Sequence, residues 1–152
     1  MMDFPHHYRA SATAAGDFVE VDSPGLPSLT TAGPAEFDGP GDVWSPETMI
    51  TATIANCFIL TFKAVARASK FDWVGIHCDV EATLDRIDRV THFTAATINV
   101  HLTIEDESKR GQAERILHKS EENCLITNSM TTAVTLLPAI EVATAAQTAT
   151  GS

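Results

Sequence analysis

The chain has 152 residues, of which 44% are hydrophobic and 20% charged, and its formal net charge is −10. These values are typical of one soluble globular domain. Because the lysines and arginines are few and scattered, we expect no basic face for binding nucleic acid or for docking on an anionic membrane.

The N-terminal third of the sequence predicts a hairpin followed by loop. Residues 8–21 hold two short strand-like runs around AAGD, in which Gly16 suits the turn. Residues 23–43 are rich in proline and glycine. We therefore expect mostly loop there, with one short strand near Leu29.

The stretch WSPETM predicts the start of a long helix that runs from Pro46 to about Ser69. Ser45 can cap the first turn, proline fits the first helical position, and Glu47 favours the positive end of the helix dipole. The first half of the helix is apolar on nearly every side, which indicates that protein surrounds it. A single sheet of this length cannot cover such a helix, so we expect a homodimer in which a second subunit covers the other face.

The segments GIHCDVEATL and THFTAATINVHLTI alternate with a period of two and predict two strands, with Cys78 on the apolar face of the first. A second amphipathic helix is expected from about Ser108 to Asn123. CLITNSM then predicts a short helical turn, and TAVTLL predicts a last strand that ends before Pro138.

This order of elements predicts an α+β fold, in which an antiparallel sheet lies beside a long buried central helix and a second helix. We expect a single domain over residues 1–142. The tail, residues 143–152, has little to bury and is expected to be disordered.

Three cysteines are present, and an odd number cannot give a fully paired disulfide framework. The N-terminal MMDFPHHYRA shows no signal-peptide pattern, so we expect a cytoplasmic protein, in a compartment where disulfides are usually transient or catalytic. The uncharged run from Thr48 to Phe62 is shorter than the roughly 20 residues that cross a bilayer. No membrane partner is therefore expected.

Two motifs resemble those of the OsmC/Ohr family, named for osmotically inducible protein C and organic hydroperoxide resistance protein. WSPETMITATIANCFILTF contains a Pro-Glu pair that opens a helix and a small-residue apolar stretch ending in Cys-Phe. AERILHKSEENCLITNSM contains a second cysteine after a charged helix. The resemblance covers roughly residues 8–142. It implies an intertwined homodimer with active sites at the subunit interface, and a thiol peroxidase chemistry that prefers organic hydroperoxides.

The resemblance also implies roles for individual residues. Cys57 matches the peroxidatic cysteine of the family, and Cys124 matches the resolving cysteine. Glu47 matches a glutamate that orients an active-site arginine.

The chain departs from the family pattern at that arginine. The hairpin reads ATAAGDF, and the loop before the long helix reads PAEFDG, where Glu36 falls close to the expected position. Arg9 is the only arginine before residue 67. It is therefore the possible activating cation within this chain.

Each of these residues also has a purely structural interpretation. The thiolate, not the thiol, attacks a peroxide, and apolar surroundings disfavour it, so Cys57 could serve core packing alone. Cys124 could be a capping or loop residue, Cys78 a packing residue, and Glu47 a residue that suits a helix dipole. Arg9 could be an exposed charge on a strand.

The leading hypothesis is a thiol-dependent peroxidase that reduces organic hydroperoxides through a Cys57 sulfenic acid and a Cys57–Cys124 disulfide, with an external dithiol as reductant. The alternatives are a dimer of this fold that binds a small apolar or thiol-bearing ligand with little peroxidase activity, and a redox sensor that forms the same disulfide. No cofactor is expected. No metal is expected either, because His77 and Asp79 share the strand face opposite Cys78.

Overall fold

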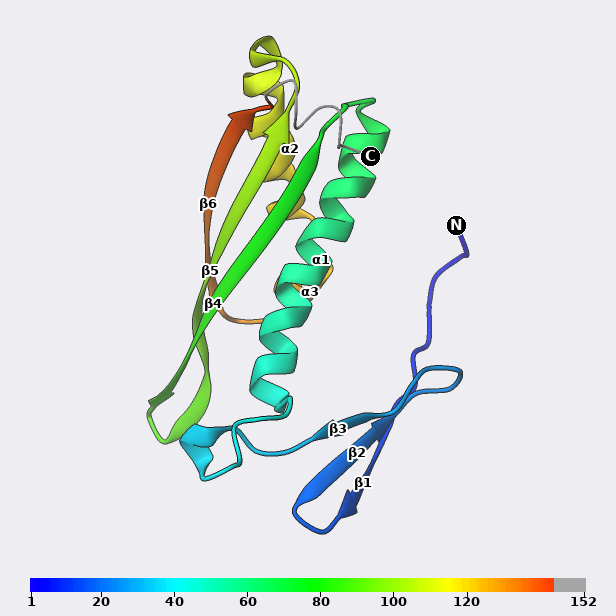
Figure 1. The fold of residues 1–152 in the computed structure, drawn as a ribbon, viewed down its shortest axis with the longest axis vertical. Helices are drawn as coiled ribbons and strands as arrows, with labels where there is room; N and C mark the ends of the chain where they lie inside the picture. Colours follow the sequence, from blue (N-terminus) through cyan, green and yellow to red (C-terminus); the bar gives the residue numbers. More distant parts are fainter. Residues whose placement is uncertain (144–152) are drawn as a thin grey trace. The chain divides into compact units, whose positions relative to one another are not determined.

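The computed structural model describes residues 1–143 and contains two three-stranded sheets (Figure 1). The chain divides into two compact units, Met1–Ile50 and Thr51–Ser152, and residues 51–143 of the second are described. Each unit is described by itself below. The expected disordered tail lies outside the described residues except for its first residue, Ala143, whose N–H donates to the carbonyl of Ile104.

The first unit contains the hairpin and short strand that the sequence predicts. β1 (Ser11–Ala15) pairs antiparallel with β2 (Phe18–Asp22), which pairs antiparallel with β3 (Leu29–Thr31). Gly16 has a φ of 64° at the tight turn between β1 and β2, a conformation that glycine adopts without a steric penalty. A short 3₁₀ helix, η1 (Ala35–Phe37), follows.

The helix α1 (Pro46–Ala68) begins where the capping pattern predicts. The Thr48 N–H donates to the Ser45 hydroxyl at 3.1 Å, and the Ser45 N–H donates to the Thr48 hydroxyl at 2.9 Å. This reciprocal pair satisfies backbone donors that a helix start otherwise leaves without partners. By length and composition α1 could also cross a bilayer. In this fold it is the core helix instead, because three of its large apolar side chains are fully buried: Ile54, Phe58 and Phe62.

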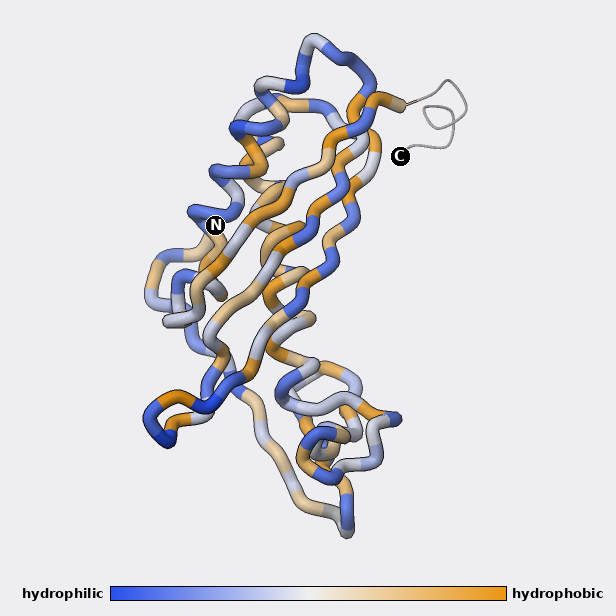
Figure 2. Tube along the Cα trace, turned by 90° about the vertical axis from the view of Figure 1, so that its left-hand side faces the viewer, coloured by the Kyte–Doolittle hydropathy of each residue, from blue (hydrophilic) through white to orange (hydrophobic). Residues whose placement is uncertain are grey.

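The sheet of the second unit begins with a long hairpin, in which β4 (Gly75–Ile87) pairs antiparallel with β5 (Val90–Ile104). Asp88 and Arg89 both have positive φ, which fits the two-residue turns that match the twist of a hairpin. Along the strands, hydrophobic and hydrophilic residues alternate (Figure 2). This alternation places one face of the sheet toward the core and the other toward solvent.

The third strand corrects two expectations. β6 (Ala133–Val142) pairs parallel with β5, so the sheet is mixed and not purely antiparallel. The reason is the connection between them, which contains η2 (Glu107–Lys109), α2 (Arg110–Glu122) and α3 (Leu125–Asn128). Such a crossover returns the chain to the same end of the sheet, as a parallel pair requires.

β6 also continues through Pro138, where the sequence predicts that it ends. Pro138 lies opposite Val100 of β5. Because β6 is the outermost strand of its sheet, it can hold a proline whose missing N–H costs no ladder hydrogen bond.

The core of the second unit lies between the sheet and the two longer helices. Its buried apolar side chains come from α1, from the inward face of β5, from α2, and from Phe71 after α1. They are Ile54, Phe58, Phe62, Val65, Ala66, Phe71, Ala96, Ile98, Val100, Leu102, Ile104, Ala113, Ile116 and Leu117.

Candidate active site

Two of the three cysteines meet inside the second unit. Cys57 lies on α1 with a half-buried side chain, and its Sγ is 3.8 Å from the hydroxyl oxygen of Thr61. Residues four apart lie one above the other on a helix, which explains this contact. Cys124 lies two residues after the end of α2, and its thiol interacts with that of Cys57. The fold therefore brings together two thiols that are far apart in the sequence.

Cys124 is fully buried and opens the short helix α3, as the sequence predicts. Its carbonyl accepts hydrogen bonds from the Asn128 N–H at 3.0 Å and the Thr127 hydroxyl at 3.1 Å. Burial raises the pKa of the Cys124 thiol, hydrogen bonds from Thr127 oppose that rise, and the neighbouring Cys57 adds to it. The thiol is consequently neutral at physiological pH.

The third cysteine, Cys78, lies on the inward face of β4 and packs against the core. Burial raises its pKa to about 11, and the charge of Asp79 and, at alkaline pH, that of the Cys124 thiolate contribute to the rise. A thiol with such a pKa is almost wholly protonated near neutral pH. Cys78 therefore has the environment that the packing interpretation requires.

The other predicted site residues lie in the first unit. Glu47 occupies the first turn of α1 and is half-buried. Glu36 is in the first turn of η1 and is exposed. Arg9 is exposed and lies just before β1, outside any strand, and its carbonyl accepts a hydrogen bond from the Ser23 hydroxyl at 2.8 Å.

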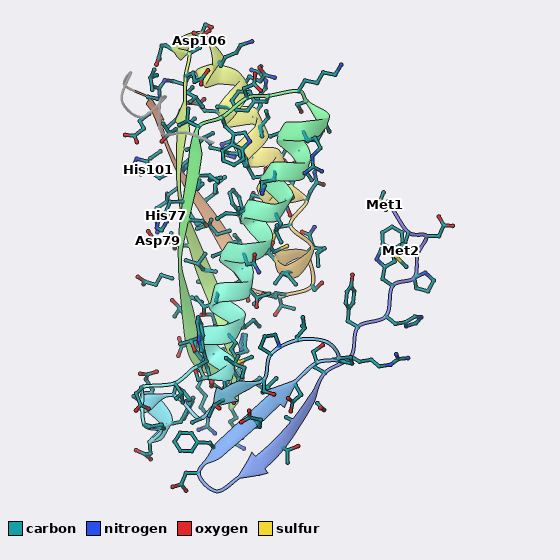
Figure 3. All side chains as sticks on the ribbon, turned by 45° about the vertical axis from the view of Figure 1, so that its right-hand side comes forward. Met1, Met2, His77, Asp79, His101 and Asp106 are labelled. Atoms are coloured by element: carbon teal, nitrogen blue, oxygen red, sulfur yellow. The ribbon has the colours of Figure 1, made fainter. Side chains whose placement is uncertain are left out.

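Histidine and acidic side chains gather on the outward face of the second unit's sheet. His77 and Asp79 lie on the side of the sheet away from α1, and His101 lies on the same side, opposite His77 (Figure 3). The distance between His77 Nε2 and Asp79 Oδ1 is 3.1 Å. His101 Nε2 is 3.8 Å from Oε2 of Glu141 on β6. Within residues 1–143, no three such side chains are arranged to hold a metal ion.

Two neighbours of the thiols are not evident from motif reading. Thr61 follows Cys57 by four positions, and Thr127 follows Cys124 by three. Both spacings are those at which side chains reach back along a helix turn. The spacing would have identified them once the two cysteines were chosen.

The fold and these contacts define an α+β protein whose core helix carries one thiol, Cys57, and in which a second thiol, Cys124, is buried beside it. Residues 39–137 match the family model described as OsmC-like protein. The chain belongs to this family.

Several solved structures share the fold. An OsmC-like protein of unknown function from Vibrio cholerae matches with a TM-score of 0.80 and 17% identity, covering 89% of this chain and all of that one. An organic hydroperoxide resistance protein OsmC from Legionella pneumophila matches with a TM-score of 0.74 and 24% identity, over 92% of this chain and all of that one. By sequence, the uncharacterized protein YmaD of Bacillus subtilis is 22% identical over 82% of this chain and 87% of its own length.

Proposed function

We propose that the protein is a thiol-dependent peroxidase that reduces organic hydroperoxides, with Cys57 as the nucleophile and Cys124 as the resolving cysteine. The observation that carries this proposal is the interaction of the two thiols inside one unit. Membership of a family that includes organic hydroperoxide resistance proteins supports the choice of substrate. The reducing cytoplasm is the setting in which such a cysteine pair is regenerated.

In the first step, the Cys57 thiolate attacks one peroxide oxygen and the O–O bond breaks. The sulfur becomes a sulfenic acid, and the other oxygen takes a proton and leaves as the alcohol. Cys124 then attacks the Cys57 sulfur, a disulfide forms, and the hydroxyl leaves as water with the Cys124 proton. A dithiol reductant restores both thiols by exchange and is itself oxidised to a disulfide.

The environment of Cys124 suits a thiol that reacts second. Because its pKa is raised by burial, it stays protonated and does not compete with Cys57 for peroxide in solution. Once Cys57 is a sulfenic acid, its proximity makes the second step intramolecular, which greatly increases the effective concentration of the attacking thiol.

The nucleophile also needs a positive charge beside it to favour the thiolate. Within the part of the chain that the structure describes, the Cys57 sulfur lies beside the Thr61 hydroxyl and the Cys124 thiol, and neither group carries a positive charge. In our proposal, Arg9 is the candidate activating cation and Glu47 the residue that orients it. Replacing Arg9 with alanine should lower the rate of the peroxide step, and replacing it with lysine should restore part of that rate.

The proposed enzyme is a homodimer. In an apolar stretch of 18 residues within α1, only 22% of the residues are buried. Leu60, which lies in this stretch, is 58% exposed. Leu125 at the start of α3 is 64% exposed as well. Apolar surface of this kind on a core helix is typical of an interface with a second subunit.

Turnover of cumene hydroperoxide with dithiothreitol as reductant tests the proposal. The reduced protein should consume peroxide catalytically, and the Cys57→Ser variant should fall to the uncatalysed rate. Cys78→Ser is the matched control and should keep its activity. A Cys57→Ser variant as active as the parent would sink the proposal.

The full burial of Cys124 favours one second candidate function, that of a redox sensor, because an external dithiol reaches a buried disulfide slowly. Such a protein would form the same disulfide but would turn over slowly. The turnover assay separates the two functions: a single equivalent of peroxide consumed, followed by little further reaction despite excess dithiothreitol, identifies the sensor.

A further inference from the structure

The two thiols of the candidate active site differ in how far solvent reaches them. Cys57 is half-buried on α1, whereas Cys124, between α2 and α3, is 0% exposed. Its neighbours on these two helices are buried as well, with no more than 8% exposure for Leu117, Ser120 and Thr127. A second subunit can only add to this burial. Solvent therefore reaches the pair from the Cys57 side, in the single chain and in the proposed dimer alike.

This difference decides how an external thiol meets the Cys57–Cys124 disulfide. In thiol–disulfide exchange, the attacking thiolate approaches one sulfur in line with the S–S bond, from the side opposite the sulfur that leaves. An attack on Cys124 would have to come through the side chains packed around it. An attack on Cys57 can follow the path by which a peroxide reaches that sulfur. Access therefore favours Cys57 as the sulfur that is attacked and Cys124 as the one that leaves.

We propose that an external dithiol reduces the disulfide by attacking the Cys57 sulfur alone, and that Thr127 assists the departure of Cys124. The inference rests on the proposed function, because it concerns the step that regenerates the enzyme. The reductant's thiolate bonds to the Cys57 sulfur, the S–S bond breaks, and its electron pair stays on Cys124, which then takes a proton from solvent. The second thiol of the reductant loses its proton and attacks the reductant sulfur of the mixed disulfide. Cys57 is released as a thiolate, and the reductant is oxidised to a cyclic disulfide.

Thr127 is placed to help Cys124 leave. Its hydroxyl donates to the Cys124 carbonyl at 3.1 Å, and its hydrogen bonds to the thiol favour the thiolate. Such donors matter because a buried charge without partners is costly, and a thiol leaves faster when its thiolate is more stable. In the mixed disulfide Cys57 carries no charge, so it no longer disfavours a thiolate at Cys124. Thr127 is therefore a positioning residue for the reductive step.

A monothiol shows which sulfur is attacked. Diamide first oxidises the thiol pair without peroxide, and excess mercaptoethanol then reduces it through a mixed disulfide. Samples are quenched with acid at successive times, which stops further exchange, and their peptides are analysed by mass spectrometry. The mercaptoethanol adduct should lie on Cys57, with Cys124 as a free thiol. An adduct on Cys124, or none at any time during reduction, would overturn the inference.

Variants at Thr127 test its part in the same step. Thr127→Val should slow the reduction of the diamide-formed disulfide by dithiothreitol about tenfold, the effect of losing one hydrogen bond to a charged group. Thr127→Ser, which keeps the hydroxyl, should retain most of the rate. Thr132→Val is the matched control, because the Thr132 hydroxyl donates instead to the carbonyl of Phe93, at 2.9 Å. Equal slowing by the two valine variants, or no slowing by Thr127→Val, would remove Thr127 from the step.

The use of diamide separates a failure of this inference from a failure of the peroxidase proposal. A disulfide that diamide forms and that mercaptoethanol opens at Cys57 would support the inference even if no organic hydroperoxide were turned over. Protein that turns over hydroperoxide but carries the adduct on Cys124 would overturn the inference and leave the peroxidase proposal intact. Diamide-treated protein without a Cys57–Cys124 bond would also overturn it.

Discussion

Oxidation of the Cys57–Cys124 pair should stabilise the protein against unfolding. The new bond closes a loop of about 68 residues between the two sulfur atoms, and the loop-entropy relation for cross-links gives roughly 4 kcal/mol for that length. The full value requires that the folded state accept the bond without strain. A bond without strain first requires that the two thiols lie close together, and the interaction of Cys57 with Cys124 in the fold meets this condition.

Guanidinium denaturation of the reduced and the peroxide-oxidised protein measures the effect. The two samples must have the same protein concentration, because unfolding of the proposed dimer would depend on it. In a thermal scan, the same difference corresponds to a rise in Tm of roughly 8–16 °C for a chain of this size.

The Cys124→Ser variant is the control, and peroxide treatment should not stabilise it. Oxidised parent protein that is no more stable than the reduced form, or less stable, would refute the reasoning. It would mean that closing the bond requires the fold to rearrange.

Three further predictions concern the core, the third thiol and the proposed dimer. Phe58→Ala should cost about 3–5 kcal/mol of unfolding free energy, because Phe58 is fully buried, whereas Leu60→Ala on the exposed side of the same helix should cost far less per subunit. The pKa of Cys78 is raised from 9.0 to about 11, so the unfolded chain loses this proton first and stability should fall between pH 9 and pH 11. Denaturation at several pH values checks this, and Cys78→Ala should flatten that part of the profile; an unchanged slope would contradict the assigned environment. Leu60→Glu should shift the protein toward monomer in sedimentation velocity, and a variant that sediments as the parent does would remove Leu60 from the interface.

The start of α1 and the hairpin of β4 and β5 could be predicted from sequence because each depends on local preferences of the chain. The start of α1 follows from Ser45 and Pro46, whose preferences act within one turn, and the reciprocal hydrogen bonds with Thr48 confirm the capping. The hairpin of β4 and β5 follows from alternation around a short turn. In each case the residues that decide the structure are neighbours in the chain.

The partner of β6 could not be predicted in the same way. Whether β6 runs parallel or antiparallel to β5 depends on where the crossover places it, and no residue of β6 encodes that direction. The sequence predicts that β6 ends before Pro138, and this boundary is wrong for a related reason. Its missing N–H ends an inner strand but not an outer one, and position in the sheet is a property of the whole fold.

The candidate site shows the same division. Sequence reasoning selected Cys57 and Cys124 through the family resemblance, since nothing local to either residue predicts that they meet. The burial that raises the pKa of Cys124 and the meeting of its thiol with Cys57 arise from the packing of α1, α2 and α3. Such features appear only when these segments are assembled.

The most direct test of the account is to map the disulfide formed by one equivalent of an organic hydroperoxide added to the reduced protein. Free thiols are alkylated after the reaction, and the peptides are analysed by mass spectrometry. The account predicts a link between Cys57 and Cys124, with Cys78 recovered as an alkylated free thiol. A link that includes Cys78, or three free thiols after the peroxide has been consumed, would contradict it.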